Sequence, residues 1–210
     1  MPVIIFAACA LASAGLAVRF AVRGPRRLYA VFKPLTMVLV VAAALAAETP
    51  VPAAYKTFIL AGLVCSLAGD IALLAPEKGF AAGLLCFLAA HVFYILAFRP
   101  APGHPTSMGV LLPFIILGLL MFRTLTPSLG RLKLPVLVYT AAITIMAWLA
   151  AGRYVEYGGA RPLLAFAGAV LLLLSDSALA YNRFVKKIPA AQVIILGMYF
   201  PAQLLIALSV

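Results

Sequence analysis

The chain has 210 residues, of which 66% are hydrophobic and only 10% are charged, and its mean hydropathy is +1.17. Soluble domains average about 45–50% apolar and about 25% charged residues, so this composition excludes a soluble globular protein and indicates a membrane protein. The net charge of +11 does not indicate nucleic-acid binding, because the basic residues are scattered and no recognition motif accompanies them.

Eight apolar stretches follow one another along the chain, and a helix needs roughly 20 such residues to cross a bilayer. They cover approximately residues 3–22, 31–47, 55–75, 80–98, 108–122, 134–151, 162–181 and 191–209. We therefore predict an all-α fold, a polytopic transmembrane bundle of about eight helices that forms one integral membrane domain over residues 1–210. The first stretch lacks a preceding basic segment, so we interpret it as a retained helix rather than a signal peptide.

The basic residues are divided unequally between the two predicted membrane faces. The connections after the first, third, fifth and seventh stretches carry most of them: Arg19, Arg23, Arg26, Arg27, Lys33, Lys78, Arg123, Arg131, Lys133, Arg183, Lys186 and Lys187. The opposite face carries Lys56, Arg99, Arg153 and Arg161. The positive-inside rule predicts that the first group is cytoplasmic and that both termini face outside. With such short connections, we expect a bacterial inner (cytoplasmic) membrane protein.

Two of the five acidic residues lie inside apolar stretches. Asp70 is near the end of the third stretch, in CSLAGDIALL (65–74), and Asp176 is near the end of the seventh, in LLLLSDSALA (171–180). An ionised aspartate costs about 2.5–3.5 kcal/mol at the centre of a membrane helix, and a bundle tolerates it when the group faces the interior, has a partner or does chemistry. The similar segments are 106 residues apart, which suggests a four-plus-four internal repeat; chance likeness between apolar segments is the alternative.

Topology predicts that several polar residues meet at one membrane face. Helices with odd numbers end on the face where helices with even numbers begin, so Asp70, Asp176 and Lys33 belong to the same face. Asn182 and Arg183 follow Asp176, and Arg183 lies on nearly the same side as Asp176 if the helix continues. We therefore expect a polar cluster near the cytoplasmic interface, although Lys33 and Asp70 could equally form a purely structural ion pair.

Three further polar residues lie deeper in the predicted bundle. His91 and Tyr94 are near the middle of the fourth stretch, and Gln203 is in the middle of the eighth. A histidine at this depth is a functional candidate, and a neutral histidine bound to a neighbouring helix is the alternative. Hydrogen bonding between helices is the commonest role of a glutamine there. His104 lies in a connection, and we give it no role.

The sequence contains no GxSxG, HExxH or glycine-rich phosphate loop. Its two histidines are too few for a zinc site made of three histidines. We therefore expect no metal and no cofactor, and any chemistry would depend on carboxylates, one histidine, amides and cations.

Taken together, these motifs resemble the YhhN-like family of multi-pass membrane proteins, which includes the lysoplasmalogenases. The resemblance extends from the second stretch to the eighth and rests on KPLT (33–36), SLAGDIALL (66–74), HVFYILAF (91–98), SDSALAYNRF (175–184) and YFPAQLLI (199–206). Pro201 departs from the pattern expected in the last motif and should bend the eighth helix. The resemblance implies a lysophospholipid substrate in the bilayer, whose vinyl ether bond is hydrolysed to a fatty aldehyde and glycerophosphoethanolamine or glycerophosphocholine.

This chemistry fits the predicted polar residues. Hydrolysis of a vinyl ether needs a general acid that protonates the vinyl carbon and a second group that directs water. We assign Asp70 and Asp176 as the acid/base pair, without deciding which is the acid, and His91 as a catalytic residue that acts with them. The candidates for contact with the substrate are Lys33, Asn182 and Arg183 at its phosphate and Tyr94 and Gln203 in the deeper part.

Other functions are compatible with the same residues. A proton-coupled transporter or lipid carrier would also keep paired acids inside the membrane and show an internal repeat, although we would expect its acids near the midplane. A metal-dependent lipid amidase would need more histidines. A purely structural bundle gives no reason for two matching aspartate motifs.

Overall fold

The structure is a computed structural model that describes residues 1–48, 51–75, 79–100 and 108–210. Lys78 and His104 lie outside these residues. Within the described residues, eight helical segments are long and apolar enough to cross a membrane, the fifth of them (Met108–Ser128) together with the 3₁₀ turns at its two ends, as the sequence predicted. The bounds of the α-helices are α1 Pro2–Arg23, α2 Arg26–Leu45, α3 Ala53–Ala72, α4 Gly79–Phe98, α5 Leu111–Leu125, α6 Lys133–Tyr157, α7 Ala160–Phe184 and α8 Ala191–Leu208. Short 3₁₀ turns at Met108–Val110, Thr126–Ser128 and Gly130–Leu132 flank α5.

Several helix boundaries are set by proline and glycine. Pro25 and Pro52 directly precede α2 and α3, where the ring fixes a backbone angle suited to entering a helix. Gly158 and Gly159 separate α6 from α7 with φ angles of 60° and 79°, which glycine adopts without the steric cost that a side chain brings. The chain can therefore reverse direction there within two residues.

Several helices extend beyond the predicted stretches, and the extensions of α2 and α7 change the setting of polar residues. α2 begins at Arg26, so Lys33 lies two turns inside the helix rather than at its start. α7 continues to Phe184, so Asn182 and Arg183 are helical and lie two turns after Asp176. Pro201 lies inside α8.

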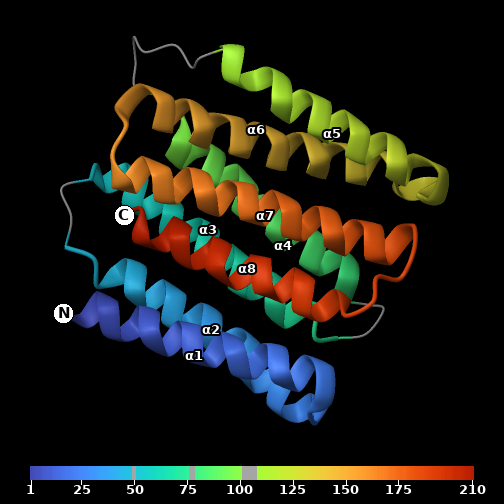
Figure 1. The fold of residues 1–210 in the computed structure, drawn as a ribbon, viewed down its shortest axis with the longest axis horizontal. Helices are drawn as coiled ribbons and strands as arrows, with labels where there is room; N and C mark the ends of the chain where they lie inside the picture. Colours follow the sequence, from blue (N-terminus) through green and yellow to red (C-terminus); the bar gives the residue numbers. More distant parts are fainter. Residues whose placement is uncertain (49–50, 76–78, 101–107) are drawn as a thin grey trace.

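The helices form three parts of one bundle. α1 and α2 pack against each other on one side, α5 and α6 lie on the opposite side, and α3, α4, α7 and α8 lie between them (Figure 1). Both chain termini are at one end of the bundle, on the left in Figure 1, and α7 is joined to α8 at the other end. α5 is peripheral, since Leu125 is its only buried residue.

Small residues allow the central helices to approach closely. A Cβ atom on Gly62 of α3 would lie 2.3 Å from the ring of Tyr94 on α4, and one on Gly168 of α7 would lie 2.8 Å from the Ala202 carbonyl of α8. Membrane bundles depend on such close packing because burial away from water gives no driving force between helices in lipid. These contacts fix α3 against α4 and α7 against α8, the helices that carry Asp70, Asp176 and one partner of each, Tyr199 on α8 and His91 on α4.

Candidate active site

Both intramembrane aspartates line one chamber between α2, α3, α4, α7 and α8. Its volume is about 280 Å³, and Lys33, Asn182 and Arg183 also line it. The structure therefore brings together the five residues that topology assigned to one face. The chamber extends to Lys187 and Gln192 at the α7–α8 connection. We call it the polar chamber.

Asp70 is held in a buried ion pair. Lys33 Nζ lies 3.0 Å from Asp70 Oδ1, and these side chains are only 6% and 2% exposed. The Tyr199 hydroxyl donates a hydrogen bond of 2.7 Å to Asp70 Oδ2. A carboxylate with a cation on one oxygen and a hydroxyl donor on the other is stabilised in its ionised form. The ion pair that the sequence left open as an alternative is thus present, within the lining of the polar chamber.

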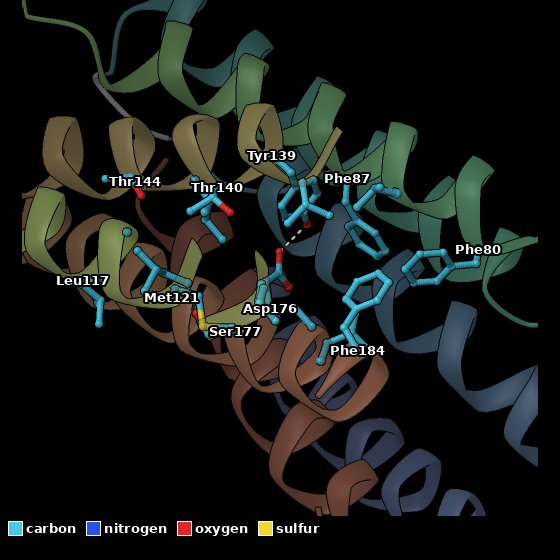
Figure 2. A pocket seen from close by; sticks show the side chains of 18 of the residues that line it. Phe80, Phe87, Leu117, Met121, Tyr139, Thr140, Thr144, Asp176, Ser177 and Phe184 are labelled. Carbon is cyan, nitrogen blue, oxygen red and sulfur yellow. Dashed lines mark hydrogen bonds between the residues drawn. The ribbon is translucent and has the colours of Figure 1, made fainter. Parts of the chain in front are cut away.

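Asp176 has partners of a different kind. The Tyr139 hydroxyl donates a hydrogen bond to Asp176 Oδ2 (Figure 2), and His91 Nε2 lies 3.5 Å from the same oxygen. The His91 ring also meets the Tyr139 ring edge to face, with 5.0 Å between the centroids. In the described part of the chain, neither lysine nor arginine forms an ion pair with Asp176. The two carboxylates therefore share a chamber but differ in charge environment.

The contacts of the two aspartates fit the four-plus-four repeat. Lys33 precedes Asp70 by 37 positions, and Tyr139 precedes Asp176 by the same number. In each half of the chain, the second helix thus supplies a partner to the aspartate on the third helix. The other partner comes from the fourth helix of the opposite half, Tyr199 of α8 for Asp70 and His91 of α4 for Asp176. The site therefore depends on both halves.

Asn182 and Arg183 line the polar chamber but also have structural contacts. Asn182 Oδ1 accepts a hydrogen bond of 2.9 Å from the Ile188 backbone N–H, which ties the α7–α8 connection to the end of α7. The Arg183 guanidinium carbon lies 4.8 Å from the centroid of the Phe80 ring, within the range of a cation–π interaction. The side-chain oxygen of Asn182 thus has a structural role in the α7–α8 connection. The Arg183 guanidinium is held at the chamber wall by its contact with Phe80.

Tyr94 and Gln203 are not brought to the carboxylates. Tyr94 donates a hydrogen bond of 2.7 Å to Gln203 Oε1, and Gln203 Nε2 donates one of 3.1 Å to Ser66 Oγ. These hydrogen bonds join Tyr94, Gln203 and Ser66 into a buried link between α4, α8 and α3. Neither Tyr94 nor Gln203 lines the polar chamber. His91, three residues before Tyr94, contacts Asp176 and Tyr139 instead. Its Nδ1 atom is buried without a hydrogen-bond partner.

A second, mostly apolar cavity lies on the other side of Asp176, between α4, α5, α6 and α7. Figure 2 shows Asp176 and Tyr139 between two groups of side chains that line this cavity. Phe80, Phe87 and Phe184 lie on one side, and Leu117, Met121, Thr140 and Thr144 lie on the other. We call this cavity the apolar slot.

Sequence reasoning missed Tyr139 and Tyr199, the hydroxyl donors to the two carboxylates. The repeat could have revealed Tyr139, because it occupies the position 106 residues after Lys33. No comparable signal indicated Tyr199, whose contact with Asp70 joins α8 to α3 across 129 positions. Lys187 and Gln192 at the chamber mouth were also not predicted as site residues. Among the described residues, no three histidine, cysteine or acidic side chains are grouped so that they could hold a metal ion.

Residues 28–210 match the model of the YhhN family. Lysoplasmalogenase TMEM86B from Mus musculus is 37% identical to the chain over 160 residues, which are 75% of this chain and 66% of the mouse protein. Lysoplasmalogenase TMEM86A from Bos taurus is 35% identical over 163 residues, again 75% of this chain and 66% of the relative. The match thus spans slightly less than two thirds of these relatives.

A bacterial relative matches over a longer range. The protein named uncharacterized membrane protein YhhN from Escherichia coli O157:H7 is 29% identical over 197 residues, which are 94% of each chain. No solved structure is significantly similar to the chain.

Proposed function

The chain belongs to the YhhN family, and on that premise we propose that it is a membrane-embedded hydrolase that cleaves the vinyl ether bond of lysoplasmalogens. The products would be a fatty aldehyde and glycerophosphoethanolamine or glycerophosphocholine. The names of the mammalian relatives support this substrate class. The observation that carries the proposal is the pair of carboxylates in one chamber, of which only Asp70 has a lysine partner.

This difference between the carboxylates supports a division of catalytic roles between them. Asp70, paired with Lys33, is the ionised group that accepts a proton, and Asp176, without a lysine or arginine in an ion pair, is the group that donates one. Two carboxyl groups in unlike environments commonly divide acid and base roles in this way. Tyr139 and His91 fix the position of the Asp176 carboxyl group, so we describe them as positioning residues.

The reaction can be written with all protons accounted for. Asp176 gives its proton to the vinyl carbon that does not carry oxygen, and the positive charge that forms is shared between the other vinyl carbon and the ether oxygen. Water adds to that carbon while its proton passes to Asp70. In the resulting hemiacetal, the hydroxyl proton returns to Asp176, the carbon–oxygen bond to glycerol breaks, and the glycerol oxygen takes the proton from Asp70. Both carboxyl groups then regain their starting states.

The headgroup of the substrate would occupy the polar chamber. Arg183 and Lys187 line it at the end of the bundle where α7 joins α8, and guanidinium and ammonium groups form strong hydrogen bonds to phosphate. Lys33 already forms an ion pair with Asp70. Its proposed role is therefore to keep the Asp70 carboxylate ionised, and it does not bind the phosphate. By the positive-inside rule this end of the bundle faces the cytoplasm and both termini face outward, as expected for a protein of a bacterial inner membrane.

The repeat around the two carboxylates also favours a second candidate, a proton-coupled transporter or lipid carrier, because carriers commonly contain related halves with a shared site between them. The two functions can be distinguished by whether activity requires a sealed membrane. A hydrolase releases aldehyde in detergent solution, whereas a carrier shows its activity only across a sealed membrane.

The deciding experiment is the release of aldehyde from lysoplasmenyl-ethanolamine by the purified protein in detergent. Wild type would be compared with Asp176→Asn and Asp70→Asn, and 1-acyl lysophospholipid would be the control substrate. We expect aldehyde from wild type and a loss of at least about 100-fold in each folded variant, because acid/base groups contribute about 10²–10⁴-fold. A folded wild-type protein that releases no aldehyde would rule out the hydrolase and leave the carrier.

A further inference from the structure

The polar chamber and the apolar slot meet at Asp176. Five residues line both cavities: Leu73, Phe80, Phe87, Asp176 and Leu179. Asp176 is the only acidic or basic residue in this shared group, and Tyr139, its hydrogen-bond donor, lines only the slot. A molecule that extends from the chamber into the slot would therefore pass the carboxyl group of Asp176.

The slot differs from the chamber in chemistry. Apart from Asp176, its polar side chains are the hydroxyls of Tyr139, Thr140, Thr144 and Ser177, and the rest of its lining is aliphatic or aromatic side chains, one methionine and one glycine. The chamber, in contrast, contains two lysines and an arginine. An occupant of both spaces must have a charged end and an apolar end, with the bond between them near Asp176.

Two of the helices that line the slot approach each other closely at one point. A Cβ atom on Gly118 of α5 would lie only 2.7 Å from Thr144 Oγ1 of α6, so the two helices are in close contact at this point. Val136 and Thr144 both line the slot, and their separation of eight positions corresponds to about 12 Å along α6 at a rise of about 1.5 Å per residue. The slot thus extends for about 12 Å along α6, and Thr144, the last residue of α6 in its lining, lies at the contact with α5.

We propose that the apolar slot holds the alkenyl chain of the substrate and that Thr144, beside the contact between α5 and α6, limits the chain length that the enzyme accepts, together with Leu117, whose side chain lines the slot and is 38% exposed. This inference rests on the proposed function for the identity of the occupant. It places the charged headgroup in the polar chamber, the hydrocarbon chain between α4, α5, α6 and α7, and the vinyl ether beside Asp176. The space left for the end of the chain beside the Gly118–Thr144 contact then determines which chain lengths the enzyme prefers.

The first test compares substrates that differ only in chain length. Thr144→Phe would fill the slot at the contact between α5 and α6, and Ile145→Phe is its matched control because Ile145 is 40% exposed and does not line the slot. We expect Thr144→Phe to lower kcat/KM about tenfold more for an 18-carbon chain than for an 8-carbon chain, since closely fitting pockets discriminate by such factors. The control should leave the ratio unchanged. Equal losses for both chain lengths would overturn the proposal.

A second pair of variants covers the case in which Thr144→Phe does not fold. Leu117→Trp places a large ring into the slot from α5, and Leu119→Trp, on a residue that is 63% exposed, is its control. We expect the same change in chain-length preference for Leu117→Trp alone. A folded Leu117→Trp protein with wild-type preference would contradict the assignment of the slot.

Chain position can also be measured without turnover. A 1-O-alkyl lysophospholipid has no vinyl bond to cleave, and a diazirine at the end of its chain would label the residues that surround it. We expect labelled peptides from α5 and α6 around Leu117 and Thr144. Labelling there with no aldehyde from the natural substrate would keep the slot and reject hydrolysis. Labels spread over the outer helix faces would reject the slot even if aldehyde is released.

Discussion

Lys33 Nζ lies 3.0 Å from Asp70 Oδ1 within the membrane bundle. Separating two charges at this depth is costly, so each member depends on the other. The pair also distinguishes the two aspartates, because the position in the second half that corresponds to Lys33 is occupied by the neutral side chain of Tyr139.

Removing Lys33 should destabilise the protein. In Lys33→Met, the buried Asp70 carboxylate loses its cation, and breaking a buried ion pair in this way typically costs about 3–5 kcal/mol. Thermal or denaturant unfolding in detergent would measure the change. The double variant Lys33→Met with Asp70→Asn should recover most of the stability, because no unpaired charge remains. A Lys33→Met protein as stable as wild type would show that the pair is not buried as described.

Tyr139 should affect turnover more than substrate binding. Tyr139→Phe retains the ring that meets His91 and removes only the hydroxyl that donates to Asp176. We expect kcat to fall about tenfold with KM nearly unchanged, the effect of losing one hydrogen bond to a reacting group.

Tyr154→Phe is the matched control for this variant, because Tyr154 stacks on Phe166 with 5.9 Å between the ring centroids and lies outside both cavities. It should leave both kinetic constants at their wild-type values. A change in KM alone for Tyr139→Phe would contradict a role in positioning Asp176.

Gln203 should contribute to stability rather than to catalysis. It accepts a hydrogen bond from Tyr94 and donates one to Ser66, away from both cavities. Gln203→Leu should therefore reduce the free energy of unfolding by about 1 kcal/mol, the usual value of a hydrogen bond between membrane helices. Activity per folded molecule should remain at the wild-type level, and a large fall in kcat would return Gln203 to the site.

Arg183 and Lys187 should act on the phosphate of the substrate. We expect Arg183→Gln and Lys187→Gln each to raise KM for lysoplasmenyl-ethanolamine about tenfold with kcat retained, since hydrogen bonds to charged groups contribute about 1.5–3 kcal/mol. A 1-O-alkenylglycerol has no phosphate, so its hydrolysis should be unaffected. Equal effects on both substrates would mean that the two cations support the fold and do not bind the headgroup.

The sequence predicted the parts of this molecule that depend on local composition and on topology. Long apolar stretches define the helices, and the alternation of helix direction places Lys33, Asp70 and Asp176 at one end of the bundle. The sequence did not predict which side chains touch across the bundle. The bond from Tyr199 to Asp70 and the link from Tyr94 to Gln203 depend on how helices far apart in sequence are rotated and spaced, and close approach at Gly62 and Gly168 controls that spacing.

Isotopic labelling would test the reaction itself. If Asp176 protonates the vinyl carbon, hydrolysis in D₂O should place one deuterium on the carbon next to the aldehyde group. Hydrolysis in H₂¹⁸O should leave the glycerophospho product free of ¹⁸O, because water adds to the vinyl side and the glycerol oxygen is retained. Mass spectrometry of both products would measure the labels, with reduction of the aldehyde as it forms to stop later exchange. Label in the glycerol hydroxyl would mean that water attacks the glycerol carbon, and the assignment of Asp176 as the general acid would then be wrong.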